Sequence, residues 1–358
     1  MRAAVMRDAG LVVDDVAVPE PGPGEVLVKT LACGICGSDL HALKHAPLMV
    51  EAAKEAGGGF QMDLSRDIVM GHEFCAEVLD FGPDTARSLK PGDRVCSVPM
   101  TIHGGEVMSV GYSHLVPGGY AENMVLFEPL LLRVPNGLAT DLAALTEPAA
   151  VGFHAVAMSN IADGEIPLVI GCGPVGLAVI LALKARGIGP VIAADFSPTR
   201  RRLAETLGAD IVVNPVEHSP YESWAAVAGK QADGKPVPPN PLTGRPLFRP
   251  GVYFECVGVP GVIEAMMTGA QRGSRIVVVG VCMEQDKIRP FTAINKELNL
   301  QFVLGYTPEE FAATLDNIAE GIIDVAPLVT GHVDIDGVPQ AFTELADPEK
   351  HAKIIVSP

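Results

Sequence analysis

The sequence predicts a β-rich domain followed by an α/β domain with a doubly wound parallel sheet. Residues 1 to about 130 carry short β-prone runs separated by Gly and Pro, which is typical of a small barrel-like domain. From about residue 150, strand-like apolar runs alternate with helical patterns, as they do around a parallel sheet. The chain has 358 residues and 48% hydrophobic content, so it can bury two cores.

In the β-rich part, turn sequences predict where one strand ends and the next begins. Sequences such as Pro21-Gly22-Pro23-Gly24 end one run and begin the next. A short helix is expected at 47–56, because proline stands near its start and glycines 57–59 follow its end. This segment either borders a substrate pocket or is a surface excursion. The expected strands lie at 11–13, 25–28, 75–79 and 93–98, with a last strand at 353–356.

The α/β part alternates more regularly. Ser197 is expected to cap the helix after the second strand, with Pro198 at its first position. The proline-rich latter part of 214–251 is expected to be an exposed loop, and a capping box at Thr307 predicts a helix near the end. The expected strands lie at 167–170, 190–194, 211–213, 252–256, 275–279 and 300–304.

The composition narrows the classes of partner. A formal net charge of −17 argues against a nucleic-acid or anionic-membrane surface, and the short basic run 200–202 is expected to be a solvated helix face. The seven cysteines are odd in number and too sparse for a disulfide scaffold, which indicates a reducing compartment. No apolar run is long enough to resemble a membrane span. We therefore expect a cytoplasmic protein with small-molecule partners.

A glycine turn indicates a dinucleotide site. Gly171-Cys172-Gly173-Pro174-Val175-Gly176 follows an apolar run and opens a helix, whose N-terminal N–H groups suit a pyrophosphate. Asp195 ends the next strand, where a carboxylate can accept from the adenosine ribose and favour NAD over NADP. Arg200 lies close enough in sequence to reach the same ribose. The residues expected to bind the cofactor are Gly171, Gly173, Pro174, Val175, Gly176, Asp195, Arg200, Val257 and Gly280.

Two further stretches gather metal-binding and acid–base groups. Residues 33–41 bring cysteines, a hydroxyl, a carboxylate and an imidazole close together, and Gly71-His72-Glu73 adds another imidazole and carboxylate. The spacing Cys33-x-x-Cys36 also suits half of a zinc ribbon or a redox pair. The chain has no second CxxC, so Cys33 is expected to serve packing.

The order of these motifs resembles that of the zinc-dependent medium-chain alcohol dehydrogenases, most closely the sorbitol and threonine dehydrogenase-like branch. The resemblance rests on Cys36-Gly37-Ser38-Asp39-Leu40-His41, Gly71-His72-Glu73 and 169–176, and covers essentially the whole chain. It implies a GroES-like catalytic domain from 1–150 and 306–358. It also implies a Rossmann NAD-binding domain from 151–305.

The resemblance also assigns roles. Cys36, His72 and Glu147 are expected to bind a catalytic zinc, with Glu73 as the alternative or exchanging ligand. The resemblance further implies that Ser38 takes the proton of the alcohol and passes it toward His41. Asp39 is implied to hydrogen-bond the far nitrogen of His72 and fix its tautomer. If Glu73 does not bind the metal, the resemblance places it just outside the ligands.

The chain departs from many relatives after residue 95. Those relatives carry four closely spaced cysteines for a structural zinc, whereas this segment has Cys96 but no further cysteine. We expect one zinc per subunit, with His103 and His114 in loops or pocket walls.

The expected reaction is the reversible oxidation of an alcohol to a ketone or aldehyde with hydride transfer to NAD. A secondary alcohol, hydrophobic or cyclic, is favoured by apolar residues near the clusters. Three alternatives stay open: a polyol dehydrogenase, a zinc-free reductase of the quinone oxidoreductase kind, and a nucleotide-binding regulatory protein without turnover. The resemblance also implies that the sixth strand, 300–304, pairs with a second copy, which would give a homodimer or homotetramer. The apolar residues are Leu43, Pro47, Leu48, Met49, Val50, Phe60, Met62, Val110 and Leu115.

Overall fold

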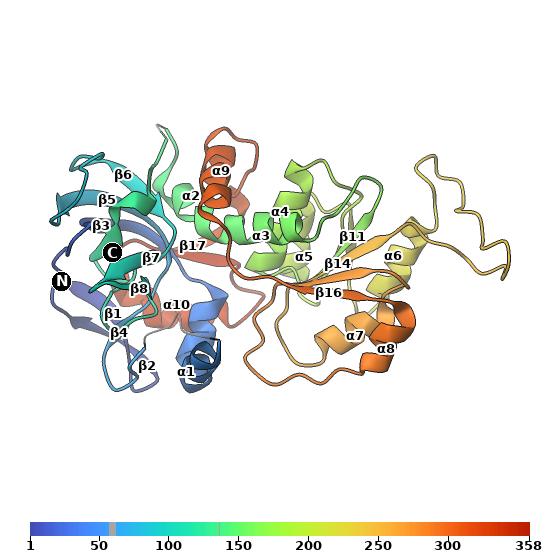
Figure 1. Cartoon of the computed structure of the whole chain (residues 1–358), viewed down its shortest axis with the longest axis horizontal. Helices are drawn as coiled ribbons and strands as arrows, with labels where there is room; N and C mark the ends of the chain where they lie inside the picture. The colour runs from blue at the N-terminus through green and yellow to red at the C-terminus, as the bar shows by residue number, and fades with distance from the viewer. Residues whose placement is uncertain (57–61, 136) are drawn as a thin grey trace. The chain divides into compact units, whose positions relative to one another are not determined.

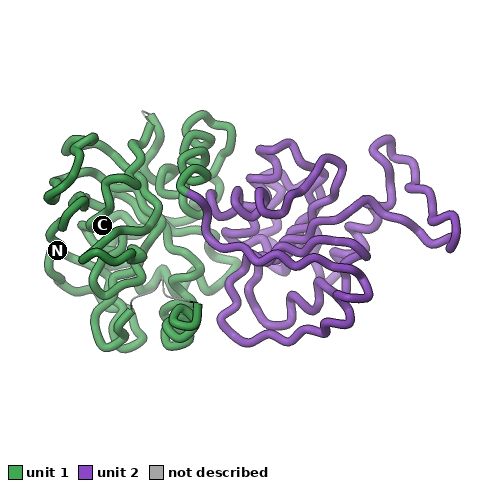
Figure 2. Tube along the Cα trace, in the orientation of Figure 1, with its two compact units in different colours: residues 1–148, 308–358 green, residues 149–307 purple. Residues whose placement is uncertain are grey.

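The computed structural model describes residues 1–56, 62–135 and 137–358, and it divides into two compact units (Figure 2). Unit 1 comprises Met1–Pro148 and Pro308–Pro358, and unit 2 comprises Ala149–Thr307. The chain therefore leaves the first unit, forms the second, and returns. The units therefore meet within two residues of the domain boundaries expected from the sequence, which lie between residues 150 and 151 and between residues 305 and 306.

Unit 1 is built on a mixed sheet in the order β10-β6-β5-β3-β18-β17, with β9 also paired to β3. The last strand, β18, runs antiparallel to β3, so the end of the chain lies beside residues 33–34. A smaller sheet has the order β2-β1-β4, and β7 and β8 form a hairpin. The strands are β1 (Arg2–Arg7), β2 (Gly10–Asp15), β3 (Glu25–Gly34), β4 (Ile68–Val69), β5 (Glu73–Phe81), β6 (Arg94–Ser97), β7 (Met100–His103), β8 (Glu106–Ser109), β9 (Asn123–Phe127), β10 (Leu131–Arg133), β17 (Val329–Val333) and β18 (Lys353–Val356).

The helices of unit 1 lie between and after these strands (Figure 1). They are α1 (Gly37–Glu55), η1 (Glu128–Leu130), α2 (Thr140–Ala144), α9 (Pro308–Ala319), η2 (Ala326–Leu328), η3 (Ile335–Gly337) and α10 (Val338–Leu345). The capping box at Thr307 correctly predicted α9, which buries Phe311, Leu315 and Ile318. Helix α3 (Thr146–Met158) begins in unit 1 and continues into unit 2.

Helix α1 is longer than expected. It begins at Gly37 rather than Pro47, because the carboxylate of Asp39 accepts from the N–H of Cys36 and caps the first turn. The helix kinks at His45, which lets Pro47 stand inside it. The helix expected at 47–56 is thus its second half, and glycines 57–59 lie outside the described residues.

The hairpin β7–β8 fills the segment that lacks the four cysteines. The buried carboxylate of Glu25 accepts from Oγ1 of Thr101 at 3.1 Å and lies 3.1 Å from Nδ1 of His103. His114 lies in the following loop, where its Nδ1 accepts from the N–H of Asp63. Both histidines therefore have local partners of their own.

Unit 2 is a parallel sheet in the order β13-β12-β11-β14-β15-β16, as the strand pattern predicted. Helices α4 and α5 lie on one face, and α7 and α8 lie on the other (Figure 1). The strands are β11 (Ile166–Ile170), β12 (Ile192–Ala194), β13 (Ile211–Val213), β14 (Gly251–Glu255), β15 (Arg275–Val278) and β16 (Asn299–Phe302). The helices are α4 (Pro174–Ala185), α5 (Pro198–Thr206), α6 (Pro220–Ala228), α7 (Val262–Gly269) and α8 (Pro290–Lys296).

Two local predictions in unit 2 have different outcomes. Ser197 caps α5 by accepting from the N–H of Arg200, and the proline-rich segment before β14 is largely exposed, both as predicted. The solvated helix face predicted at 200–202 is confirmed in part: Arg202 is exposed, whereas the half-buried Arg201 donates to the carbonyl oxygens of Asp195 and Phe196. Within the described residues, no helix is long and apolar enough to cross a bilayer.

Candidate functional site

Three potential metal ligands come together in unit 1. The ligand atoms of Cys36, His72 and Glu73 all lie within 4.8 Å of one another, and no other such group forms among the described residues. Cys36 stands at the start of α1, and Glu73 opens β5 opposite Gly34 of β3. The donors are a thiolate, an imidazole and a carboxylate, which is a set that suits zinc.

The chain reaches this geometry through Gly71, whose φ is +101°. A Cβ at that position would lie 2.8 Å from the ring of Tyr120. Only glycine combines that backbone conformation with so close an approach, so the turn that delivers His72 depends on it.

Asp39 lies behind His72, as expected. It is fully buried, and its Oδ1 is 3.3 Å from Nδ1 of His72. The carboxylate also accepts from the hydroxyls of Tyr120 at 2.6 Å and Tyr112 at 3.0 Å. Burial acts to raise the pKa of Asp39, but His72, Tyr120 and the N–H of Cys36 outweigh it and the pKa lies below its usual range. Asp39 therefore stays charged and fixed.

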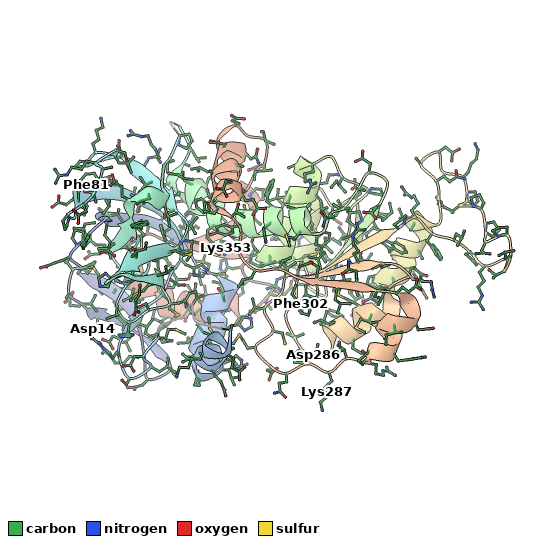
Figure 3. The ribbon with its side chains drawn as sticks, in the orientation of Figure 1. Asp14, Phe81, Asp286, Lys287, Phe302 and Lys353 are labelled. Carbon is green, nitrogen blue, oxygen red and sulfur yellow. The ribbon has the colours of Figure 1, made fainter. Side chains whose placement is uncertain are left out.

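Glu73 has a partner that the sequence did not reveal. Lys353, labelled in Figure 3, lies on β18. Its ammonium donates to both carboxylate oxygens of Glu73, at 2.6 and 2.7 Å, and to the carbonyl oxygen of Ile35 at 3.0 Å. Both side chains are buried. Burial acts to lower the pKa of Lys353, but Glu73 and Cys36 raise it above its usual value. One of the three potential metal ligands, Glu73, is thus part of a buried ion pair.

Ser38 and His41 lie on the first turns of α1, which begins directly after Cys36. The Oγ of Ser38 is 2.9 Å from the hydroxyl of Tyr112. His41 is half-buried, and its ring stacks on that of His45. Burial lowers the pKa of His41, with smaller contributions from His45 and Lys44, so the imidazole is neutral at pH 7.

Glu147 lies in the first turn of α3 and is 8% exposed. Its charge contributes to the raised pKa of Lys353, so it lies in the same electrostatic environment. It is not among the side chains that gather within 4.8 Å in the described residues. Sequence reasoning missed Lys353, Tyr112 and Tyr120, although a lysine in an otherwise apolar last strand was a signal for a buried charge.

The glycine turn of unit 2 has the expected form. Gly171 has a φ of +93°, and a Cβ on Gly176 would lie 1.8 Å from the carbonyl oxygen of Gly171. Strand β11 and helix α4 can approach only because this side chain is absent. Gly173 is the N-cap of α4, and Pro174 and Val175 begin the helix. At Gly173 a Cβ would meet nothing closer than Arg200, at 3.7 Å.

Asp195 binds the same turn. Its carboxylate accepts from the N–H of Cys172 at 2.7 Å and from the N–H of Ser197 at 2.8 Å. Each oxygen keeps a lone pair for a further donor. Val257 and Gly280 follow the neighbouring strands β14 and β15, and a methyl group of Val257 faces Gly171. The predicted cofactor residues therefore gather at one end of the sheet.

Comparison with known proteins identifies the family. A family of alcohol dehydrogenase GroES-like domains matches residues 22–136, and a family of zinc-binding dehydrogenases matches residues 174–320. The (R,R)-butanediol dehydrogenase of Bacillus subtilis is 31% identical over 355 residues, covering 97% of this chain and 96% of that protein. The chain belongs to the zinc-dependent medium-chain alcohol dehydrogenases.

Other relatives agree with this family. A sorbitol dehydrogenase from Bos taurus is 30% identical over 91% of this chain and 87% of its own length, which supports the sorbitol dehydrogenase-like branch. The crystal structure of 2R,3R-butanediol dehydrogenase from Bacillus subtilis has a TM-score of 0.80 at 30% identity, covering 100% of this chain and 99% of that one. A zinc-binding dehydrogenase from Sinorhizobium meliloti, solved with NADP, has a TM-score of 0.78 at 26% identity, with the same coverage.

These relatives confirm the predicted fold class, a GroES-like domain with a Rossmann domain. They also confirm the predicted enzyme class. This dehydrogenase is an oxidoreductase that acts on CH–OH donors and uses zinc and a nicotinamide cofactor.

Proposed function

We propose that this dehydrogenase reversibly oxidises a secondary alcohol, hydrophobic or cyclic, to a ketone with hydride transfer to NAD. The observation that carries the proposal is the gathering of Cys36, His72 and Glu73 beside Ser38 in unit 1, in a chain whose unit 2 has an intact glycine turn. In this proposal unit 1 is the catalytic domain and unit 2 the nucleotide domain.

The zinc ligands in this proposal are Cys36, His72 and Glu147, with one zinc per subunit. Glu73 is the alternative third ligand, because it lies with Cys36 and His72. Both of its oxygens accept from Lys353, however, which favours Glu73 as a group held behind the metal rather than on it. Bound zinc supplies Lewis-acid polarisation of the alcohol oxygen.

A pair of matched variants tests the ligand assignment. Glu147→Gln is expected to lose zinc on dialysis, whereas Glu73→Gln is expected to retain close to one zinc per chain, measured by elemental analysis. The reverse result would make Glu73 the ligand. Two zinc atoms per wild-type chain would refute the single site, and none would favour the zinc-free reductase reading.

The chain's own residues handle the proton. Ser38 takes the proton of the substrate hydroxyl, and His41, on the same helix, passes it toward solvent. A neutral imidazole can accept that proton at pH 7, as the lowered pKa of His41 allows. Asp39 holds the ring of His72, and the hydroxyls of Tyr112 and Tyr120 hold Asp39.

The preference for NAD over NADP is proposed from Asp195. Its carboxylate lies on the glycine turn and would repel a 2′-phosphate. Arg200 is the competing influence, because its guanidinium lies near Gly173 and its Nε is buried without a partner. The ratio of kcat/KM with NAD to kcat/KM with NADP measures whether the effect of Asp195 or that of Arg200 is the stronger.

The proposed substrate class is argued from the apolar residues near the clusters. Of the apolar residues expected near the clusters, Leu48 and Leu115 are each 42% exposed, whereas Met49, Met62 and Val110 are buried. Phe60 lies outside the described residues. A diol or polyol is the second candidate, because the relatives are named butanediol and sorbitol dehydrogenases. Rates with cyclohexanol, 2,3-butanediol and sorbitol separate the candidates.

A homodimer or homotetramer is proposed from the edge of the unit 2 sheet. Strand β16 ends the sheet, and its last residue, Phe302, is labelled in Figure 3. Phe302 is 64% exposed, and Leu304, two residues further on, is 85% exposed. An apolar edge of this kind favours pairing with a second copy. A cytoplasmic location is proposed because all seven cysteines are free thiols.

A further inference from the structure

We propose that Tyr112 is a positioning residue for proton transfer, and that its hydroxyl holds the Oγ of Ser38 in the orientation that receives the substrate proton. This inference rests on the proposed role of Ser38. Nothing in the sequence marked Tyr112, which stands in the loop after β8 with no apolar periodicity around it.

The loop brings Tyr112 to the site through a close backbone contact. Gly111 has a φ of +84°, and a Cβ there would lie 3.0 Å from the carbonyl oxygen of Gly71. The two glycines therefore pack together, and the residues that follow them meet. The rings of His72 and Tyr112 have centroids 5.2 Å apart and are tilted by 37°. Tyr112 is 6% exposed, so water competes little for its hydroxyl.

The hydroxyl of Tyr112 lies close to the oxygen atoms of both Ser38 and Asp39. It is 2.9 Å from Oγ of Ser38 and 3.0 Å from Oδ1 of Asp39. The phenol O–H reaches both oxygens, so it donates to Asp39 and to Oγ of Ser38 in a three-centre hydrogen bond. Oγ of Ser38 keeps a lone pair for the substrate proton. Its own proton is not donated to Tyr112, so Ser38 can release it toward His41 as the substrate proton arrives.

The expected size of the effect follows from this geometry. A serine side chain has three staggered rotamers, and loss of the hydrogen bond lets Oγ sample all of them. If the population of the productive Ser38 rotamer falls to about one third, the rate falls by roughly 3-fold. Loss of a hydrogen bond worth about 0.5–1.5 kcal/mol gives a similar decrease of up to roughly 10-fold. Because substrate binding is not what the bond controls, kcat is expected to fall while KM stays within about twofold.

Tyr120 provides a matched control. It donates to the other oxygen of Asp39 at 2.6 Å and lies 3.4 Å from the carbonyl of Gly34 rather than near Ser38. Tyr112→Phe and Tyr120→Phe each remove one buried phenol hydroxyl from Asp39. Only Tyr112→Phe also releases Ser38.

The test is a double-mutant cycle on the zinc-loaded full chain, with cyclohexanol or 2,3-butanediol, whichever turns over faster. Zinc content and thermal midpoint are measured for each variant. We expect Tyr112→Phe to lower kcat by about 3- to 10-fold with zinc retained, and to have no further effect in a Ser38→Ala background. Tyr120→Phe is expected to cause the same fold-change with and without Ser38.

The other outcomes overturn the inference in distinct ways. An equal loss from Tyr112→Phe with and without Ser38 means that Tyr112 acts through Asp39 and His72 instead. An unchanged kcat, or a variant that loses zinc or fails to fold, gives Tyr112 a structural role only. Full activity of the Ser38→Ala single variant would contradict the proposed role of Ser38 itself. That measurement does not involve Tyr112, so the two failures can be told apart.

Discussion

Replacing Lys353 by methionine isolates the buried ion pair behind the proposed zinc site. The side chains are 1% and 0% exposed, and the ammonium donates to both oxygens of Glu73. Methionine is of similar length and apolar, so the change removes the charge with little loss of volume. The carboxylate of Glu73 stays buried with no cation beside it.

The cost can be estimated from this geometry. Two unit charges 2.7 Å apart attract by roughly 6 kcal/mol at an effective dielectric constant of about 20. Desolvation of both ions offsets much of that attraction in the native protein, but the variant keeps the desolvation cost of Glu73. Removing one partner of such a pair typically lowers the free energy of unfolding by about 3–5 kcal/mol.

Urea unfolding measures this loss, with two probes because the chain has two units. Hydrogen exchange of the amides of β3, β5 and β18 reports on unit 1, and fluorescence of the single tryptophan, Trp224, reports on unit 2. Lys350→Met, a change at an exposed lysine three residues earlier, is the control and is expected to shift stability by less than about 0.5 kcal/mol.

A second variant makes the test decisive. Lys353→Met combined with Glu73→Gln removes both charges, so it should recover most of the lost stability. A loss below about 1 kcal/mol in the single variant, together with no recovery in the double variant, would falsify the claim that this pair stabilises unit 1.

Three further predictions concern unit 2. Gly173→Ala is expected to fold normally, because its Cβ would make only an ordinary contact with Arg200 at 3.7 Å. It is expected to weaken NADH binding by roughly 10- to 100-fold, because the added methyl group keeps the pyrophosphate from approaching the backbone. Gly176→Ala is expected to lower the melting temperature instead, and calorimetry and thermal melting separate the two. Asp195→Ala is expected to reduce the selectivity for NAD over NADP about tenfold or more, and an unchanged ratio of kcat/KM would remove Asp195 from cofactor choice. Leu304→Lys, at a side chain 85% exposed beside β16, is expected to convert dimers to monomers in light scattering; an unchanged mass contradicts edge pairing.

The parts of the fold that the sequence predicted well depend on local signals. Ser197 and Pro198 specify the start of α5, and the glycines of 171–176 specify a strand, a turn and a helix within six residues. Helix α1 was missed in its first half because its start is capped by a cysteine and Asp39, and because Pro47 was read as a beginning rather than as an interior position.

The contacts that complete the site could not be predicted locally. Lys353 and Glu73 are 280 residues apart, and Tyr112 and Ser38 are 74 apart. Lys353 meets Glu73 because β18 returns to pair with β3. Tyr112 meets Ser38 because Gly111 packs on Gly71. The sequence around Lys353 or Tyr112 has no periodic pattern from which its distant partner could be predicted.

The hydrogen-bond partners of Asp39 and Glu73 explain how both carboxylates can be buried close to Cys36 and His72. A buried carboxylate is costly unless its oxygens are satisfied. Asp39 is satisfied by two phenol hydroxyls and a backbone N–H, none of which carries a charge, so it keeps its full negative charge toward His72. Glu73 is neutralised by Lys353, which is held in turn by the carbonyl of Ile35. The remaining negative charge of this pocket therefore lies on Asp39 beside His72, on Glu147, and on Cys36 once it is a thiolate. That charge favours retention of a cation. The same reasoning predicts that Asp39→Asn weakens zinc retention more than Glu73→Gln does, and equal zinc content after dialysis of the two variants would contradict it.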